Sequence, residues 1–151
     1  MRIAFDIGGV LSKYPKIFMS MIKAFDRNNY RTRKDSYLYI EMFIITDMHN
    51  LSEIKEALQL NDLYQYIPEG NVYSADFEKY GEACKAVLLK QLKMDLFFDD
   101  FPAYVSEGDE TCRCLVMPNL KKPYYDDDWK TPNSVGDFGR RKRVDNFLKG
   151  E

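Results

Sequence analysis

The sequence predicts an α/β protein with three layers, in which helices cover both faces of a mainly parallel central sheet. Three short apolar runs are each followed directly by a polar residue: 3–5 by Asp6, 42–45 by Thr46 and 96–98 by Asp99. Helical patterns separate these runs, and such an alternation forms parallel sheets with right-handed crossovers. Parallel strands end at the same edge of a sheet, where ligands bind in this class of fold. We therefore expect the three polar residues to lie together.

The composition is that of a soluble globular protein. The chain has 151 residues, of which 45% are hydrophobic and 30% charged, and its net charge is −2. That length is enough to bury a core, and the charge balance gives no general affinity for nucleic acid or membranes. No apolar run approaches the about 20 residues that span a bilayer, and a core strand follows Arg2 directly. We expect a cytoplasmic protein without a membrane partner.

The first helix is predicted over residues 15–27. Its five apolar side chains recur at helical spacing and form one stripe, and Pro15 is acceptable in the first turn. Asn28 and Asn29 are expected to end this helix. After a polar and basic segment, residues 38–46 are expected to form the second strand.

The elements that follow are predicted from periodicity and turn residues. Residues 51–60 read as an amphipathic helix with Asn50 as its N-cap. A turn at 68–71 leads into a short strand, and a helix is expected over residues 77–92. The last strand is expected at 113–117.

Three cysteines form an odd set without the spacing of a metal finger: Cys84, Cys112 and Cys114. Cys112 and Cys114 are two residues apart, so their thiols point to the same face of the predicted last strand. We expect a buried thiol pair in a reducing compartment rather than a disulfide or a ligand site.

The order of the polar residues resembles the four motifs of the haloacid dehalogenase superfamily of phosphotransferases. Asp6 begins the run Asp-Ile-Gly-Gly-Val-Leu, Thr46 follows the second strand, a lysine comes from the helix at 77–92, and Asp99 with Asp100 comes last. The resemblance spans about residues 1–117, and its specificity lies in the ordered set. A single aspartate at a strand end is often only a cap or a turn residue. The resemblance implies a Rossmann-like core at 1–118.

The resemblance implies that Asp6 is the nucleophile, because the matching aspartate of the family forms an aspartyl-phosphate. Thr46, Asp47 and Lys85 are then expected to bind the phosphate group, and Thr46 and Lys85 to assist catalysis. Lys85 lies 14 residues before Asp99, a spacing like that of the lysine in compact members.

Two further lysines of the predicted helix, Lys79 and Lys90, compete with Lys85 for this place. Lysines on an amphipathic helix usually face solvent. We therefore expect the Lys85 ammonium to point toward Asp6 and Asp99 and the other two to reach water.

The expected cofactor is Mg²⁺, held by Asp6, the Gly8 carbonyl, Asp99 and Asp100. Carboxylate and carbonyl oxygens are the ligands that this hard cation prefers. Without a cation, adjacent carboxylates repel each other.

Gly8 is a departure from the family pattern. Phosphatases of the superfamily usually have a second aspartate there, which protonates the leaving group, and such acid catalysis contributes about 10²–10⁴-fold. The Gly8 carbonyl can still bind metal, but glycine has no acid to give. Asp47 and His49 are candidate replacements, and Lys13 and Tyr14 are weaker ones. A plain surface position before the helix at 51–60 is the simpler interpretation of His49.

No cap domain is expected. About 34 residues separate Leu11 from Thr46, and a helix and a strand already occupy them. In the superfamily, members without a cap tend to accept larger or macromolecular substrates, unless a tail or a partner covers the site.

Residues 119–151 are predicted to form a C-terminal extension on or near the core. The extension is rich in charge, proline and glycine, which makes it a poor core-former by itself. Five aromatic residues could anchor it: Tyr124, Tyr125, Trp129, Phe138 and Phe147. Its basic cluster, Arg140 to Arg143, is either a solvated face or a contact for phosphate groups, so nucleic acid is not excluded as a partner.

The function expected from the resemblance is that of a magnesium-dependent phosphatase or phosphotransferase. Its substrate is an unidentified phosphorylated small molecule or macromolecule, and Gly8 implies reduced activity. The alternative is a non-catalytic binding or regulatory protein that keeps a cation or phosphate site.

A phosphoacceptor signalling domain is disfavoured, because its acidic pair comes first and its lysine last. Nucleotide and redox-cofactor enzymes are also disfavoured, since Gly8-Gly9 lacks the third glycine of a dinucleotide fingerprint.

Overall fold

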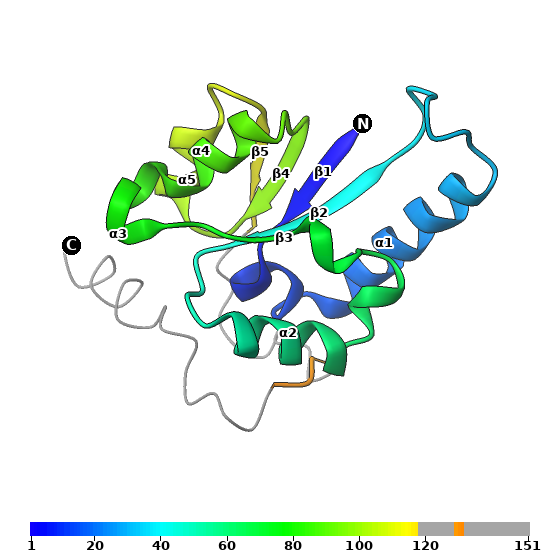
Figure 1. Cartoon of the computed structure of the whole chain (residues 1–151), viewed down its shortest axis with the longest axis horizontal. Coiled ribbons are helices and arrows are strands. Elements are labelled where there is room, and N and C mark those ends of the chain that lie inside the picture. Colours follow the sequence, from blue (N-terminus) through cyan, green and yellow to red (C-terminus); the bar gives the residue numbers. More distant parts are fainter. Residues whose placement is uncertain (118–128, 132–151) are drawn as a thin grey trace.

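The computed structural model describes residues 1–117 and 129–131 and is built around a five-stranded sheet (Figure 1). The strand order is β3-β2-β1-β4-β5, and every neighbouring pair is parallel. The strands are β1 (Arg2–Phe5), β2 (Glu41–Thr46), β3 (Val72–Ser74), β4 (Leu96–Asp99) and β5 (Arg113–Val116). The predicted α/β class with a parallel sheet is confirmed.

Helices cover both faces of this sheet. Figure 1 shows α1 (Pro15–Tyr30) and α2 (Leu51–Leu60) on one side, and α4 (Cys84–Gln91) and α5 (Pro102–Gly108) on the other. The short α3 (Phe77–Tyr80) precedes α4. Side chains alternate along β1, so that Ile3 and Phe5 join the core under α1 and α2 while Ala4 joins the core under α4.

The strand register places Asp6 between two other strand ends. Phe5, the last residue of β1, pairs with Ile44 of β2 and with Phe98 of β4. The Asp6 amide then donates a hydrogen bond to the Phe98 carbonyl, at 3.0 Å. The chain winds from β1 to one side and returns to the other side at β4, so Asp6 lies at the switch point of the topology, where open α/β sheets bind ligands.

Three phenylalanine rings pack together at the ends of β1 and β4, next to Asp6. Phe5 stacks on Phe98 with ring centroids 5.5 Å apart, and Phe18 of α1 meets both rings edge-on at 5.8 and 5.3 Å. Offset-stacked and edge-to-face pairs each contribute about 0.5–1.5 kcal/mol beyond area burial. The cluster ties α1 to the ends of β1 and β4.

The boundaries of the first helix and the second strand differ from the prediction. Helix α1 continues to Tyr30 instead of ending at 27, and β2 begins at Glu41 rather than at 38. The reason is that Asn28 and Asn29 bond across to the next segment: the Asn28 amide donates to the Leu38 carbonyl, and Asn29 exchanges two hydrogen bonds with the backbone of Ile40. Asparagine here fastens the last turn instead of stopping the helix.

The prediction of a single helix over residues 77–92 is wrong. The segment is divided into α3 and α4 by a short 3₁₀ turn at Gly81–Ala83, where Gly81 has a φ of +58°. A left-handed backbone interrupts an α-helix, and glycine adopts it without a steric cost. Helix α5 was not anticipated, although Pro102 in its first turn is a recognised signal. The helix at 51–60 and its Asn50 cap are confirmed.

The predicted buried pair of thiols is confirmed, while the reducing compartment stays a prediction. Cys112 and Cys114 are buried with their sulfur atoms 3.7 Å apart, and neither these two nor Cys84 forms a disulfide. The hydrogen bond between them lowers the pKa of the Cys112 thiol and raises the pKa of the Cys114 thiol. Both sulfurs pack under α4, against Leu89.

Most of the predicted C-terminal extension lies outside the described residues, including Tyr124, Tyr125, Phe138, Phe147 and the basic cluster Arg140 to Arg143. Trp129 lies within them and packs against the core cluster under α1 and α2. Next to it, the Asn61 side chain exchanges two hydrogen bonds with the backbone of Lys130, each 2.8 Å long. The boundary at 118 and the absence of a cap stay predictions. Among the described helices, none is long and apolar enough to cross a membrane.

Replacing Phe18 by alanine should lower the free energy of unfolding by about 3–5 kcal/mol, because it leaves a cavity beside Phe5 and Phe98 at the ends of β1 and β4. The neighbouring Ile17 is 58% exposed, so Ile17→Ala should cost less than about 0.5 kcal/mol. Urea unfolding followed by circular dichroism measures both values. Equal losses in the two variants would show that α1 is not packed as described.

Candidate active site

Asp6 is held rigidly at the end of β1. Its side chain is 0% exposed, and one carboxylate oxygen accepts the Ile7 amide at 2.8 Å while the other lies 3.0 Å from the Lys85 ammonium. The chain turns at once through Gly8 and Gly9. These contacts fix the plane of the carboxylate toward the neighbouring strand end.

Lys85 bridges the ends of β1 and β4. Its side chain is 0% exposed, and its ammonium lies 2.5 Å from the Asp99 carboxylate in addition to its contact with Asp6. Burial by itself lowers the pKa of Lys85, but the charges of Asp99 and Asp47 outweigh it and raise the pKa above its ordinary value. The ammonium is therefore charged at neutral pH. The expected placement is confirmed, since Lys79 and Lys90 are exposed.

Asp99 and Asp100, at the end of β4, have different surroundings. Asp99 is fully buried and accepts a hydrogen bond from the Phe101 amide at 2.8 Å, and burial raises its pKa in spite of Lys85. Asp100 is half-buried. Burial, followed by the charge of Asp99, raises the pKa of Asp100 to about 7. The single charge of Lys85 thus does not balance the three carboxylates of Asp6, Asp99 and Asp100 at this edge of the sheet.

The carboxylates of Asp6, Asp99 and Asp100 are grouped as metal ligands are. One oxygen from each lies within 4.8 Å of the other two. Around Mg²⁺, with oxygen ligands at about 2.1 Å, opposite ligands are about 4 Å apart. The three oxygens are hard donors, and they lie close enough together to contact a single cation. The donor set therefore fits Mg²⁺. The Gly8 carbonyl belongs to the turn that follows Asp6.

Gly9 makes room for this cluster. A Cβ atom at this position would lie 1.9 Å from the Asp100 carboxylate, and the Gly9 φ is +70°, a conformation that other residues rarely adopt. The glycine is thus required both for the turn and for the approach of Asp100. The sequence showed a glycine pair at this point but not which carboxylate it admits.

Thr46 and Asp47 stand at the end of β2, the next strand. Thr46 is 1% exposed, and its hydroxyl oxygen accepts the Met48 amide at 3.3 Å. The Asp47 carboxylate is buried and accepts a hydrogen bond from the Tyr104 hydroxyl at 2.9 Å. Burial, followed by the charge of Asp47, raises the pKa of Tyr104. Tyr104 was missed because helix α5 was not predicted.

The candidate replacements for the missing acid occupy unequal positions. His49 is exposed, beyond the buried end of β2. Lys13 is only 4% exposed, and although burial lowers its pKa, the charge of Asp100 acts in the opposite direction. Lys13 thus interacts electrostatically with Asp100, whereas the Asp47 carboxylate accepts the hydrogen bond from Tyr104. Tyr14 is buried, and the Lys13 ammonium lies 5.9 Å from its ring centre.

Comparisons with known proteins give no similarity: no family model, no curated protein and no solved structure matches this chain. A fold by itself does not imply a function. The function is therefore argued from the chemistry of the residues at the strand ends.

Replacing Gly9 by alanine should weaken Mg²⁺ binding about tenfold or more, because the new methyl group displaces the Asp100 carboxylate. Gly81→Ala is the matched control: its φ is +58°, but nothing lies within 4 Å of the added Cβ. The rise in melting temperature with added MgCl₂ measures binding to the folded protein. Equal responses of the two variants to Mg²⁺ would exclude a role for Gly9 in the cluster.

The apo protein should lose stability as the pH rises from about 4 to 7. The pKa of Asp100 is about 7 in the folded state, against an ordinary value of 3.8, so the folded protein holds its proton longer. Deprotonation through this window lowers the free energy of unfolding by up to about 4 kcal/mol. Asp100→Asn should remove most of this loss in urea unfolding with a chelator present. The exposed Asp62→Asn should preserve it, and a flat wild-type profile would contradict the assignment.

Proposed function

We propose that this chain is a magnesium-dependent phosphatase or phosphotransferase of the haloacid dehalogenase type, with a Rossmann-like core and no cap. The observation that carries the proposal is the convergence of Asp6, Asp99 and Asp100 around one point, with Lys85 bridging the first two. Thr46 ends the adjacent strand. A nucleophile, a cation site, a fixed positive charge and a hydroxyl are the parts that phosphoryl transfer requires.

The proposed reaction has two steps. In the first, an Asp6 carboxylate oxygen attacks the phosphorus atom, the bond from phosphorus to the ester oxygen breaks, and the departing oxygen takes up a proton from water. In the second, water attacks the phosphorus of the aspartyl-phosphate and gives up a proton to solvent. The bond from phosphorus to the Asp6 oxygen breaks, which releases phosphate and restores the Asp6 carboxylate. Contacts from the Ile7 amide and Lys85 orient the carboxylate for attack.

Asp6, the Gly8 carbonyl, Asp99 and Asp100 are the groups that would hold Mg²⁺. When bound, the cation neutralises charge on the phosphoryl oxygens. The Thr46 hydroxyl, the Asp47 amide and the Lys85 ammonium are the proposed donors to the phosphate. Because the Asp6 side chain is 0% exposed, a substrate reaches it only after neighbouring groups move.

The substrate is proposed to be a phosphorylated small molecule or macromolecule, in agreement with a core that has no cap. The chain is proposed to act in the cytoplasm, because its three cysteines are buried free thiols.

Gly8 favours a second candidate function. Without an acid at this position the protein could keep the cation and phosphate site and act as a non-catalytic binding or regulatory protein. The Asp47 carboxylate is engaged with Tyr104 and His49 is exposed, so neither is placed as a ready substitute. The two functions differ in turnover rather than in ligand binding.

If the site keeps its nucleophile but lacks the acid, p-nitrophenyl phosphate should be hydrolysed far faster than alkyl phosphates, because its leaving group needs no proton. Gly8→Asp should then raise the alkyl rate by about 10²-fold or more. Gly8 has φ −68° and ψ 134°, which aspartate adopts without strain. Steady-state phosphate release measures all four rates.

Asp6→Asn is the control for this experiment and should abolish turnover of both substrates. Turnover of neither substrate by the native protein or by Gly8→Asp, with Mg²⁺ and phosphate still bound, would refute the enzyme and leave the binding protein. Fast alkyl ester hydrolysis by the native protein would mean that another acid is present. Lys13, Asp47 and His49 would then be substituted in turn.

A further inference from the structure

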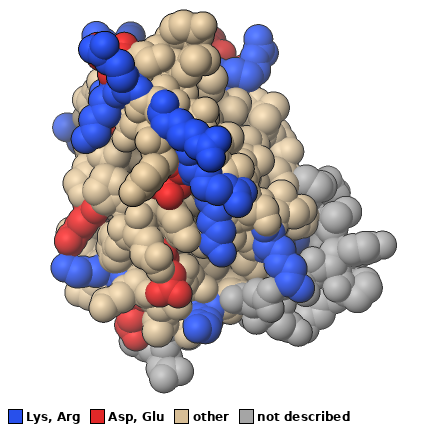
Figure 2. Space-filling model, turned by 90° about the vertical axis from the view of Figure 1, so that its right-hand side faces the viewer, with Lys and Arg blue, Asp and Glu red and all other residues tan. Residues whose placement is uncertain are grey.

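The exposed face of α1 carries a row of basic side chains that the candidate active site does not use. Lys23, Arg27 and Arg31 are exposed and follow one another at four-residue intervals, so they lie on one face of the helix. Figure 2 shows Lys and Arg side chains gathered in a band across this side of the molecule. Within the part of the chain that the structure describes, these three residues form no ion pair.

This row is a local excess of positive charge on an acidic protein. Residues 15–38 contain six lysines and arginines and two aspartates, a net charge of +4, while the whole chain has −2. The remainder of the chain is therefore acidic. A separation of charge of this kind attracts a polyanion to one face and repels it from the others.

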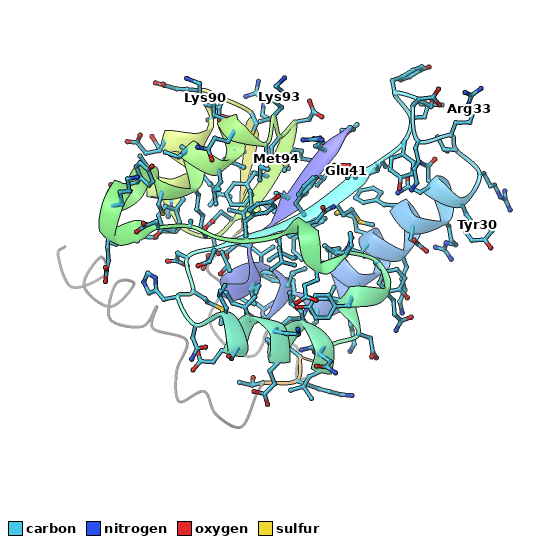
Figure 3. The ribbon with its side chains drawn as sticks, viewed as in Figure 1. Tyr30, Arg33, Glu41, Lys90, Lys93 and Met94 are labelled. Atoms are coloured by element: carbon cyan, nitrogen blue, oxygen red, sulfur yellow. The ribbon has the colours of Figure 1, made fainter. Side chains whose placement is uncertain are left out.

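Two exposed aromatic rings adjoin the row. Tyr30 is 94% exposed and Tyr37 is 85% exposed, which leaves nearly the whole of each ring in water. Figure 3 shows Tyr30 projecting outward from the C-terminal end of α1 and Arg33 from the segment that follows it. Aromatic rings set among basic side chains are the means by which proteins stack unpaired bases while neutralising phosphates.

The same face is hollowed at two places. A pocket of about 580 Å³ at the end of α1 is lined by Arg27, Tyr30 and Arg31, with Asp26 as its acidic group. A second pocket, of about 480 Å³, lies toward the start of the helix and is lined by Lys23 and Lys130 together with Trp129. Each pocket combines basic groups with an aromatic ring.

We propose that the face formed by Lys23, Arg27, Tyr30, Arg31 and Tyr37 binds single-stranded nucleic acid. Residues four apart advance about 6 Å along a helix, comparable to the separation of successive phosphates in an extended strand. Duplex DNA keeps its bases stacked inside, so the exposed tyrosines would have no role there. The pocket beside Arg27 and Arg31 is lined by Ala24 and Asn28 rather than by long aliphatic side chains, and vesicles are included in the test because Ile17 and Leu38 are exposed. The inference does not depend on the proposed phosphatase activity.

The test is fluorescence anisotropy of the full chain with a fluorescein-labelled oligothymidylate longer than α1, over a series of KCl concentrations. Arg27→Glu with Arg31→Glu should weaken binding at least tenfold and reduce the salt slope by more than 1, since each phosphate contact on a single strand contributes about 0.7. Lys90→Glu with Lys93→Glu is the matched control, because it makes the same change of charge at exposed residues away from α1 (Figure 3). The control should change affinity less than twofold.

A second variant separates stacking from charge. Tyr30→Ala should weaken oligothymidylate binding about tenfold without altering the salt slope, because the ring carries no charge. All the substituted side chains are exposed, and circular dichroism checks that each variant stays folded.

Three results would overturn the proposal. The first is absence of binding at low salt, and the second is an equal loss of affinity in the arginine and lysine double variants. The third is tighter binding to a duplex of the same length, or to vesicles containing phosphatidylserine, with no effect of Tyr30→Ala. That last result would assign the face to a duplex or to a membrane instead.

Discussion

The Lys85 ammonium, buried between the carboxylates of Asp6 and Asp99, is the contact on which the organisation of the strand ends depends. A charge with no access to water is tolerated only where opposite charges and hydrogen bonds replace its hydration. Lys85 thereby joins α4, on one face of the sheet, to β1 and β4. The connection continues from Asp99 through the Phe101 amide into α5, whose Tyr104 reaches Asp47 at the end of β2. One series of buried polar contacts thus positions groups from three neighbouring strands.

This arrangement leaves the edge short of positive charge. Three carboxylates meet near the Lys85 ammonium, and burial, followed by the charge of Asp99, raises the pKa of Asp100 to about 7. A divalent cation would relieve this shortage of positive charge, which is why the same geometry supports both an enzyme and a binding protein. Gly8 is the position at which the two proposed functions differ most directly, because an acid assists turnover but is not needed to hold a cation or a phosphate.

The sequence was most informative where a local pattern decides the structure. Apolar runs that end in Asp6, Thr46 and Asp99 marked the strand ends correctly, and the interval of 14 residues, which resembles the spacing in compact members of the superfamily, selected Lys85. Contacts between distant residues could not be read in this way. The Asn29 bonds to Ile40 extend α1, and the approach of Asp100 to Gly9 depends on how two loops pack. Tyr104 was missed because a helix as short as α5 gives little periodicity, and Gly81 showed no sign in the sequence that it would take a left-handed conformation.

The central position of β1 also has a consequence for the order of assembly during synthesis. The strand is made before its partner β4, which is encoded more than 90 residues later, as the bond from the Arg2 amide to Asp95 illustrates. Pairing across such a separation carries a large loop-closure cost and slows folding. Until β4 leaves the ribosome, one side of β1 has no strand to pair with, and Asp6 has neither Lys85 nor Asp99 beside it. The nascent chain must therefore keep an apolar edge from aggregating while the residues between β1 and β4 are made, and its polar centre forms only after β4 is present.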